Sequence, residues 1–320
     1  MRVAAVRGDH ESDAGFCHEA LLYSGRDEFL QATGAFIREG ISAGEPALVV
    51  VSAEKIAMLR GELGRDAELV QFADMSKVGS NPARIIPAWQ DFVTERGDAG
   101  RPARGIGEPI SSDRLPAELV ECQRHESLLN LAFAATQAFW LMCPYDTETL
   151  DPAVVEEALR SHPVVTADGA RRESASYAGL EVAAEQCHER LPEPVPRPKE
   201  LYFEAASLAA LRQYVGLRAA DAGLGSRRTE DVLLAANEVA TNSLRHAGGA
   251  GVLRVWEEPH ALVCEVRDDG SFDMPLAGRE RPVRGQVGGY GLWLANQLCD
   301  LVQIRSIPAG SVVRLHMRRD

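Results

Sequence analysis

The stretch Ala236-Asn-Glu-Val-Ala-Thr-Asn-Ser-Leu-Arg-His246 carries the clearest signal in this 320-residue chain. At 100° per residue, Glu238, Asn242 and His246 line up on one face of a helix, four residues apart. The opposite face is apolar and consists of Leu233, Ala236, Ala240 and Leu244. A solvated helix face is the simplest interpretation of such a polar line, and spacing alone favours it. Two glycine-bearing segments downstream reverse that preference.

The first segment is Val263-Cys-Glu-Val-Arg-Asp-Asp-Gly270, where an alternating strand runs into Asp-x-Gly. The second is Gly288-Gly-Tyr-Gly-Leu292, followed by an apolar helical run at 293–298. In this order, the helix and the two segments resemble the N, G1 and G2 boxes of the GHKL, or Bergerat, ATP-binding fold. The anti-sigma-factor serine kinase branch is the most similar. The resemblance covers about residues 200–318 and implies an α+β sandwich with helices on one face of a mixed sheet.

The resemblance implies ATP and Mg²⁺ as cofactors and gives each box a role. Glu238 is the expected catalytic base, and Asn242 offers its amide oxygen to Mg²⁺. Asp268 would accept a hydrogen bond from the adenine amine, and Gly270 would let the base approach the backbone. Ser311 stands where the family usually has a threonine that holds this aspartate.

The remaining nucleotide-binding residues follow from the same resemblance. They are His246, Gly289, Gly291 and Leu292, of which the two glycines would wrap the phosphates at a helix N-terminus. Packing at the helix end is the alternative role for His246. The chain departs from the family at Phe272, where the second glycine of the G1 box is expected, and a side chain there narrows the freedom of the loop. The segment between the G1 and G2 boxes is short, which implies a small ATP lid.

Whole-chain properties limit the classes of function. A chain of 320 residues is long enough for two domains, and a net charge of −13 with a pI near 5.2 argues against nucleic acid as the main partner. No apolar run approaches the ~20 residues of a membrane-spanning helix, and the N-terminus lacks the apolar core of a signal peptide. We expect a cytoplasmic protein without membrane partners. The predicted divisions are a loose N-terminus at 1–15, a first domain at 16–165, a helical and proline-rich linker at 166–199 and an ATP-binding domain at 200–320.

Strands alternate with helices through the first half, which predicts a doubly wound α/β sheet with helices on both faces. The order of these segments and their amino-acid sequences resemble those of the MEDS sensory domain, a module related in fold to RecA-like ATPases. The matching stretches are His18-Glu-Ala-Leu-Leu-Tyr23, Gly44-Glu-Pro46, Asp74-Met75, Asn81-Pro-Ala-Arg84, Arg104-Gly-Ile-Gly-Glu-Pro109, Arg124-His-Glu-Ser-Leu-Leu-Asn130 and Cys143-Pro-Tyr-Asp146. The likeness covers about residues 16–163. No P-loop motif occurs, so this half is expected to sense rather than to hydrolyse a nucleotide.

A small-molecule signal would sit in the crevice at the carboxyl ends of the strands. Five polar residues are the candidates for binding it, with structural hydrogen bonding as the alternative for each: His18, Arg104, Glu108, His125 and Asp146. Of the six cysteines, Cys17, Cys122 and Cys143 lie near these histidines in sequence. Their spacing matches no standard zinc pattern, so buried free cysteine is favoured over a metal or redox role.

The leading hypothesis is a signalling regulator whose sensory domain controls a protein-serine kinase. The expected partners are a sigma factor and an anti-sigma-factor antagonist that accepts the phosphate, and the resemblance also implies a homodimer. A sensor histidine kinase is one alternative, although its phosphoacceptor candidates are only His188, beside the proline-rich stretch, and His125, inside the first domain. A non-catalytic, nucleotide-responsive scaffold is another, and Phe272 is its best support.

Overall fold

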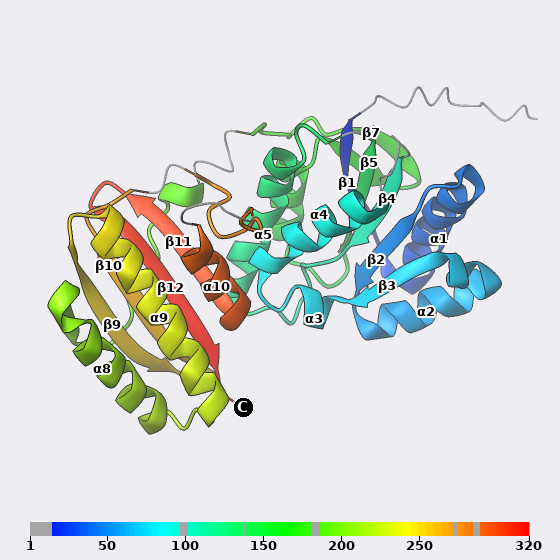
Figure 1. The fold of residues 1–320 in the computed structure, drawn as a ribbon. Coiled ribbons are helices and arrows are strands. Elements are labelled where there is room, and N and C mark those ends of the chain that lie inside the picture. Colours follow the sequence, from blue (N-terminus) through cyan, green and yellow to red (C-terminus); the bar gives the residue numbers. More distant parts are fainter. Residues whose placement is uncertain are drawn as a thin grey trace, which may run out of the picture.

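Two α/β units make up the computed structural model, which describes residues 15–96, 102–136, 138–180, 186–271, 274–283 and 289–319 (Figure 1). The first unit contains a seven-stranded sheet in the order β3-β2-β4-β5-β1-β6-β7. All neighbouring strands are parallel except β6 and β7. The strands are β1 (Phe16–Tyr23), β2 (Ala47–Val51), β3 (Val70–Asp74), β4 (Ala103–Gly107), β5 (Phe139–Asp146), β6 (Val164–Ala167) and β7 (Ala170–Glu173).

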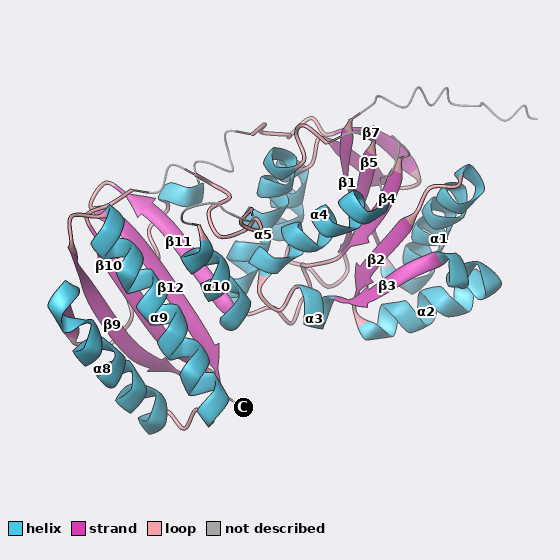
Figure 2. Cartoon of the chain, in the orientation of Figure 1, coloured by secondary structure: helices cyan, strands magenta, loops and turns pink. Residues whose placement is uncertain are grey.

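Helices cover both faces of this sheet, as the alternation of strands and helices predicts (Figure 2). They are α1 (Gly25–Ala43), α2 (Ala53–Leu63), α3 (Met75–Val78), α4 (Ile85–Arg96), α5 (Pro116–Ala132) and α6 (Pro152–Ser161), with 3₁₀ turns η1 (Gly64–Leu69) and η2 (Pro82–Arg84). Phe36 of α1 and Leu59 of α2 belong to one core, and Trp89 of α4 and Leu128 of α5 belong to another. The apolar run of β2 is buried on both faces of the sheet, because Val50 packs in one core while Val49 and Val51 pack in the other.

Two glycines of β4 make room for the largest buried side chain of the second core. A Cβ at Gly105 would lie 2.8 Å from Leu141 Cδ1 and 3.0 Å from Trp89 Cζ3. A Cβ at Gly107 would lie 2.9 Å from Trp89 Cζ2. Residues two apart in a strand share a face, so the Gly-Ile-Gly sequence forms a flat surface on which the indole of α4 packs.

The second unit is an antiparallel sheet in the order β11-β12-β10-β9-β8. Helices α8, α9 and α10 lie on one face of it (Figure 1). The strands are β8 (Glu200–Glu204), β9 (Ala250–Glu258), β10 (Ala261–Asp268), β11 (Leu301–Ile307) and β12 (Gly310–Arg318), and the helices are α8 (Leu208–Asp221), α9 (Ser226–His246) and α10 (Tyr290–Leu298). The apolar core between the helices and the sheet contains Leu211, Val239, Leu262 and Leu315. The helices lie on one face of the sheet, as expected, but all neighbouring strands are antiparallel, whereas we expected a mixed sheet.

The first residues of the helical and proline-rich linker expected at 166–199 form strands. Strand β6 pairs with β1 and β7 pairs with β6, so the first sheet continues to Glu173. A 3₁₀ turn, η3 (Gln186–His188), and the proline-rich stretch precede β8, while η4 (Ala205–Ser207) follows it. Residues 181–185 lie outside the described part. Alanine- and glutamate-rich composition indicated a helix, but pairing with the edge of the sheet decides the conformation at 164–173.

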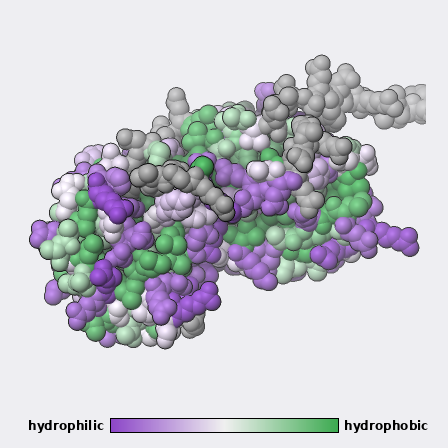
Figure 3. Space-filling model, in the orientation of Figure 1, coloured by the Kyte–Doolittle hydropathy of each residue, from purple (hydrophilic) through white to green (hydrophobic). Residues whose placement is uncertain are grey.

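None of the described helices is long and apolar enough to cross a membrane. The face drawn in Figure 3 carries hydrophilic and hydrophobic residues side by side over both units. Large exposed apolar side chains are distributed along the chain, for example Leu69, Leu217 and Tyr202.

We expect Gly107→Ala to destabilise the chain, since the added methyl group must displace the Trp89 ring in a packed core. Such overpacking costs about 1–3 kcal/mol. Gly61→Ala is the matched control, because that glycine lies in α2 with nothing within 4 Å of its Cβ position. The control should gain about 0.5–1 kcal/mol from helix propensity. Urea unfolding measures both, and equal midpoints for the two variants would contradict the packing role of Gly107.

Candidate functional site

Helix α9 supplies the polar line of the second unit. Its buried residues are Val232, Ala235, Ala236, Val239, Ala240 and Ser243. Leu233 and Leu244, which we expected on the apolar face, are only partly buried. The core-facing stripe is therefore rotated toward Val239 and Ser243. As a result, Glu238 and Asn242 are half-buried beside the stripe instead of opposite it, and His246 is exposed at the end of the helix.

Asp268, the last residue of β10, is held by three donors. Ser311 lies directly across the antiparallel ladder from it, and the Ser311 hydroxyl donates to Asp268 Oδ1 at 2.5 Å. The backbone N–H of Gly270 donates to the same oxygen at 2.9 Å. Ser243 of α9 donates to Oδ2 at 2.5 Å. Hydrogen bonds to a carboxylate are short and strong, so the orientation of Asp268 is set from two strands and one helix.

Ser243 has no role in the sequence-based assignment. The signal that could have identified it is its position three residues after Ala240, which places a hydroxyl on the apolar stripe of α9. A buried hydroxyl needs a partner, and the carboxylate at the end of the neighbouring strand provides it.

Close backbone approach explains the glycines around Asp268. A Cβ at Gly270 would lie 2.8 Å from Ala247 Cβ, just beyond the end of α9. Gly310 has φ +120°, and a Cβ there would lie 1.9 Å from the Asp268 carbonyl oxygen. Side chains at these positions would separate α9, β10 and β12 at the point where they meet.

The start of α10 lies against Asn242. Gly289 adopts the left-handed conformation that precedes the helix, with φ 85°. A Cβ at Gly291 would lie 2.8 Å from Asn242 Nδ2, and Leu292 is buried in the core below. The first free backbone N–H groups of α10 are thus next to the amide of Asn242, and such groups attract anions. Gly288 and Phe272 lie outside the described residues.

The structure therefore brings Asn242, Asp268, Gly270, Gly291 and Ser311 into one region, at the ends of α9, β10 and β12 and the start of α10. Glu238 lies one helical turn before Asn242. His246 ends the same helix and is exposed to solvent. The carboxylate, amide and free N–H groups in this region can accept a hydrogen bond, ligate a hard cation and bind phosphate oxygens, respectively.

The five candidates of the first unit fall into three separate places, and Arg104 is the clearest correction. It is the second residue of β4, at the amino end of the strand, where we expected a carboxyl end. Its Nε donates to Glu45 at 2.5 Å and its Nη1 donates to the Phe36 carbonyl at 2.9 Å. The guanidinium also lies over the Trp140 ring. Arg104 thus ties α1 to the sheet.

Glu108 and Asp146 do lie at the carboxyl ends of their strands. Tyr23 donates its hydroxyl hydrogen to Glu108 at 3.1 Å, and Lys55 forms a short ion pair with the same carboxylate. Burial raises the pKa of Glu108, although the neighbouring ammonium and phenol oppose the shift. The side chain of Asp146 accepts from the Glu148 backbone N–H at 3.1 Å.

His18 and His125 are buried away from this edge. His18 points from β1 to α5 and contacts Glu126 there, and burial lowers its pKa to about 4. His125 is buried within α5, and desolvation lowers its pKa to about 3. All six cysteines are free thiols, and Cys122 and Cys143 are buried while Cys17 is half-buried. Sequence reasoning assigned no role to Glu126 or to His162, which also faces that carboxylate.

Two family models match the chain. The first is MEDS, the methanogen/methylotroph DcmR sensory domain, which matches residues 17–163. The second is the histidine kinase-like ATPase domain, which matches residues 202–317. None of the curated proteins compared with the chain matches it.

We expect the double variant Ser243→Ala/Ser311→Ala to bind ATP more weakly, because Asp268 loses two of its three donors and is free to rotate. Loss of such hydrogen bonds costs about 1–2 kcal/mol, which corresponds to roughly a 5- to 30-fold higher Kd. Thr241→Ala is the control, since that hydroxyl donates only to the Asn237 carbonyl on the same helix. Calorimetric titration with Mg·ATP measures the effect. Equal affinities in the double variant and the control would show that Asp268 does not contact the nucleotide.

Proposed function

Because the chain joins a MEDS sensory domain to a histidine kinase-like ATPase domain, we propose that it is a signalling regulator whose first half controls an ATP-dependent protein-serine kinase. In this proposal the first half has a RecA-like fold and the second half is a GHKL ATPase of the anti-sigma-factor kinase branch. The phosphate acceptor is a serine of an anti-sigma-factor antagonist, and the second protein partner is a sigma factor. A homodimer is part of the same proposal.

The single observation that carries the kinase assignment is the oriented Asp268 carboxylate beside Asn242 and the start of α10. These residues fit Mg·ATP, which supplies the transferable γ-phosphoryl group when it is bound. Asp268 selects adenine by accepting from its amine, Asn242 ligates the metal, and Gly289 and Gly291 leave backbone N–H groups open to the phosphates. Glu238, one turn from Asn242, takes the proton of the acceptor hydroxyl.

Contacts between the two halves support control by the sensory domain. Arg84 of the first half binds the carbonyl groups at the end of α10, with Nε donating to Asn296 at 2.8 Å and Nη2 donating to Gln297 at 2.8 Å and to Cys299 at 2.9 Å. A cation at a helix C-terminus satisfies free carbonyl groups and matches the helix dipole. The opposite end of α10 contacts Asn242. Helix α10 therefore links the sensory half to the proposed magnesium ligand.

The segment 274–283, which we call the lid segment, is also held by the first half (Figure 1). Arg279 is 3% exposed and donates to Glu121 of α5 at 2.7 Å. Arg281 donates to Asp91 of α4 at 2.7 Å, and Leu276 packs against the second core of the first half. The lid segment lies between Asp268 and α10 in the chain. Because α4 and α5 hold this segment, a movement of these helices would displace the residues next to the proposed nucleotide site.

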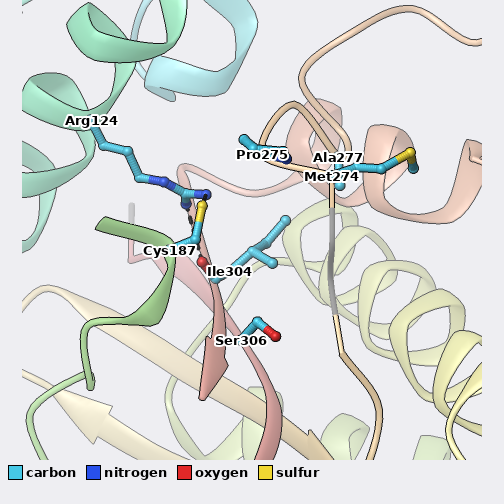
Figure 4. Close-up of a pocket in the computed structure, with 7 residues that line it drawn as sticks. All are labelled: Arg124, Cys187, Met274, Pro275, Ala277, Ile304 and Ser306. Carbon is cyan, nitrogen blue, oxygen red and sulfur yellow. Dashed lines mark hydrogen bonds between the residues drawn. The ribbon is translucent and has the colours of Figure 1, made fainter. Parts of the chain in front are cut away.

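Arg124 of α5 also contacts the second half, at β11 and the connection between the halves (Figure 4). Its guanidinium donates to the Ile304 carbonyl at 3.1 Å and to Cys187 Sγ at 2.8 Å. Together with Ser306 of β11, three residues of the lid segment, Met274, Pro275 and Ala277, complete the lining of a small cavity of about 10 Å³ there. The contact joins α5, the connection between the halves and β11.

The sensor histidine kinase alternative requires an accessible phosphoacceptor. His125 is 1% exposed inside α5 and is therefore inaccessible. His188 is exposed in the 3₁₀ turn η3, with its Nδ1 2.7 Å from the Ser306 carbonyl oxygen, and it lies beside the proline-rich stretch and not on a long helix. The buried position of His125 and the short turn around His188 support transfer to a separate protein.

We expect Glu238→Gln to bind Mg·ATP within about twofold of the native affinity but to lose phosphotransfer. Removal of a general base lowers the rate by about 10²- to 10⁴-fold. Glu230→Gln is the control, because that exposed carboxylate lies in the first turns of the same helix. Labelled ATP and the cognate antagonist measure transfer. Undiminished labelling in Glu238→Gln would contradict the assigned base, and an acid-labile phosphate on the chain itself would favour the histidine kinase.

We expect Arg84→Ala to loosen α10, since the variant loses its hydrogen bonds to three carbonyl groups of that helix end. Hydrogen–deuterium exchange in residues 290–298 should accelerate at least about tenfold, as expected for a loss near 1.4 kcal/mol. Mg·ATP affinity should change in the same variant. Lys77→Ala is the control, since it removes an exposed positive charge from α3 of the same half. Unchanged exchange and affinity in Arg84→Ala would show that this contact does not couple the halves.

A further inference from the structure

Four side chains with metal-ligating atoms meet inside the first half, between the sheet and α5. They are His18 of β1, Glu126 of α5, Cys143 of β5 and His162, which follows α6. Each is at most 1% exposed, and one ligand atom from each lies within 4.8 Å of the others. Neither the kinase site nor the contacts between the halves use this cluster.

The hydrogen bonds around the two imidazoles define their tautomers. Asn130 donates its amide hydrogen to the Ser161 carbonyl at 2.7 Å, so its Oδ1 is an acceptor toward His18 Nδ1, 3.1 Å away. The His162 Nδ1 lies 2.8 Å from the Ala158 carbonyl oxygen, which can only accept. Ser161 Oγ also lies 3.0 Å from His162 Nδ1, and this hydroxyl has the Glu157 carbonyl as an acceptor for its own hydrogen. Hydrogen on the Nδ1 of both rings satisfies all of these acceptors. Outer partners of this kind orient the histidine ligands of protein metal sites.

With hydrogen on Nδ1, both neutral rings present an Nε2 lone pair to the same carboxylate oxygen. Glu126 Oε2 lies 3.1 Å from His18 Nε2 and 3.3 Å from His162 Nε2. One proton on one ring would leave the other lone pair facing the carboxylate. Two protons would place two imidazolium cations, with ring centroids 3.9 Å apart, in a buried layer. A metal cation bound between the two imidazoles and the carboxylate removes the repulsion between lone pair and carboxylate, and it makes a second imidazolium unnecessary.

Three of the distances in the cluster are close to those between the ligands of a small metal ion, and all four ligand atoms lie within 4.8 Å of one another. Cys143 Sγ lies 3.4 Å from His18 Nε2, and the two separations from Glu126 Oε2 are similar. Bonds of about 2.0–2.3 Å at tetrahedral angles place ligand atoms about 3.3–3.8 Å apart. We propose that His18, Glu126, Cys143 and His162 form a mononuclear, tetrahedral site for a divalent transition-metal ion of the zinc class.

The donor set selects the class of ion. Two imidazoles and a thiolate suit Zn²⁺ and chemically similar ions, whereas Mg²⁺ and Ca²⁺ prefer oxygen ligands. Binding releases the thiol proton of Cys143, which leaves as a hydronium ion to bulk water, and no oxidant or reductant is needed. Four protein ligands and full burial make it a closed site. The metal fastens α5 to β1, β5 and the end of α6.

The test uses the full chain, stripped with a chelator and titrated with Zn²⁺ and with Co²⁺ as a spectroscopic probe. We expect one ion per chain, a higher thermal midpoint, and the intense visible absorption and sulfur-to-cobalt charge-transfer band of tetrahedral cobalt with a thiolate ligand. Cys143→Ser should lose the charge-transfer band and raise the Kd for the metal more than about 100-fold, beyond the effect of an outer-partner change. Cys264→Ser is the control, since that thiol is equally buried in the ATPase half and should keep the band.

Asn130→Ala tests the site without removing a ligand, and we expect a Kd about 10- to 100-fold higher. Circular dichroism and a cooperative thermal transition report that each variant is folded, and neither measurement depends on the kinase proposal, so failure of the metal proposal is separate from failure of the kinase proposal. The proposal is overturned if the native chain binds neither ion, if Cys143→Ser keeps the cobalt charge-transfer band, or if Cys264→Ser loses it.

Discussion

One buried carboxylate connects the two halves of this chain. Glu121 is fully buried on α5 and contacts Arg279 and Arg305 of the second half, each at 2.7 Å, as well as Arg124 of its own helix at 3.6 Å. The pKa of Glu121 is lowered because these guanidinium groups outweigh the opposing effect of burial. Burial lowers the pKa of Arg279 to about 10, so it stays a cation at neutral pH. Desolvation offsets much of the attraction in such clusters, but removal of one partner is costly. The cluster therefore restricts how the halves dock more than it adds net stability.

The contacts of Glu121 explain why α5 buries so many charged residues. The periodicity of the sequence did not predict that these charges are buried. The helix buries Glu118, Glu121, Arg124, His125 and Glu126 together with Leu128 and Leu129. An amphipathic surface helix would expose most of these charges. Here one side of α5 faces the sheet, where Glu126 meets His18 and His162, and another side faces the second half, where Glu121 and Arg124 find their partners. Glu121 and Glu126 are only five residues apart, so the cluster around His18 and the residues that hold the lid segment are separated by little more than one turn of helix.

Local patterns predicted the elements well but not the contacts between them. The alternation of strands and helices in the first half, and the Asp-x-Gly at the end of β10, depend on neighbours in sequence, and both are present in the structure. Arg104 was placed at the wrong end of its strand because the boundary of β4 determines which edge a residue occupies. Ser243, Glu126 and His162 act through partners 25 to 108 residues away, from Asp268 for Ser243 at a separation of 25 to His18 for Glu126 at 108. No periodicity within one element contains that information.

Helix α10 shows why such long-range contacts matter for a regulator. It is nine residues long, so its ends are about 14 Å apart at 1.5 Å per residue. One end contacts the amide of Asn242 through Gly291, and the other is held by Asn81 and Arg84 of the sensory half. Asn296, near the second end, also donates to the Gly278 carbonyl of the lid segment at 2.9 Å. A short helix moves as a rigid body, so displacement of the end held by Arg84 also displaces the end beside Asn242. Rearrangement of the sensory half would then alter the proposed phosphate-binding end of the site, at Gly291 and Asn242, without unfolding any element of either half.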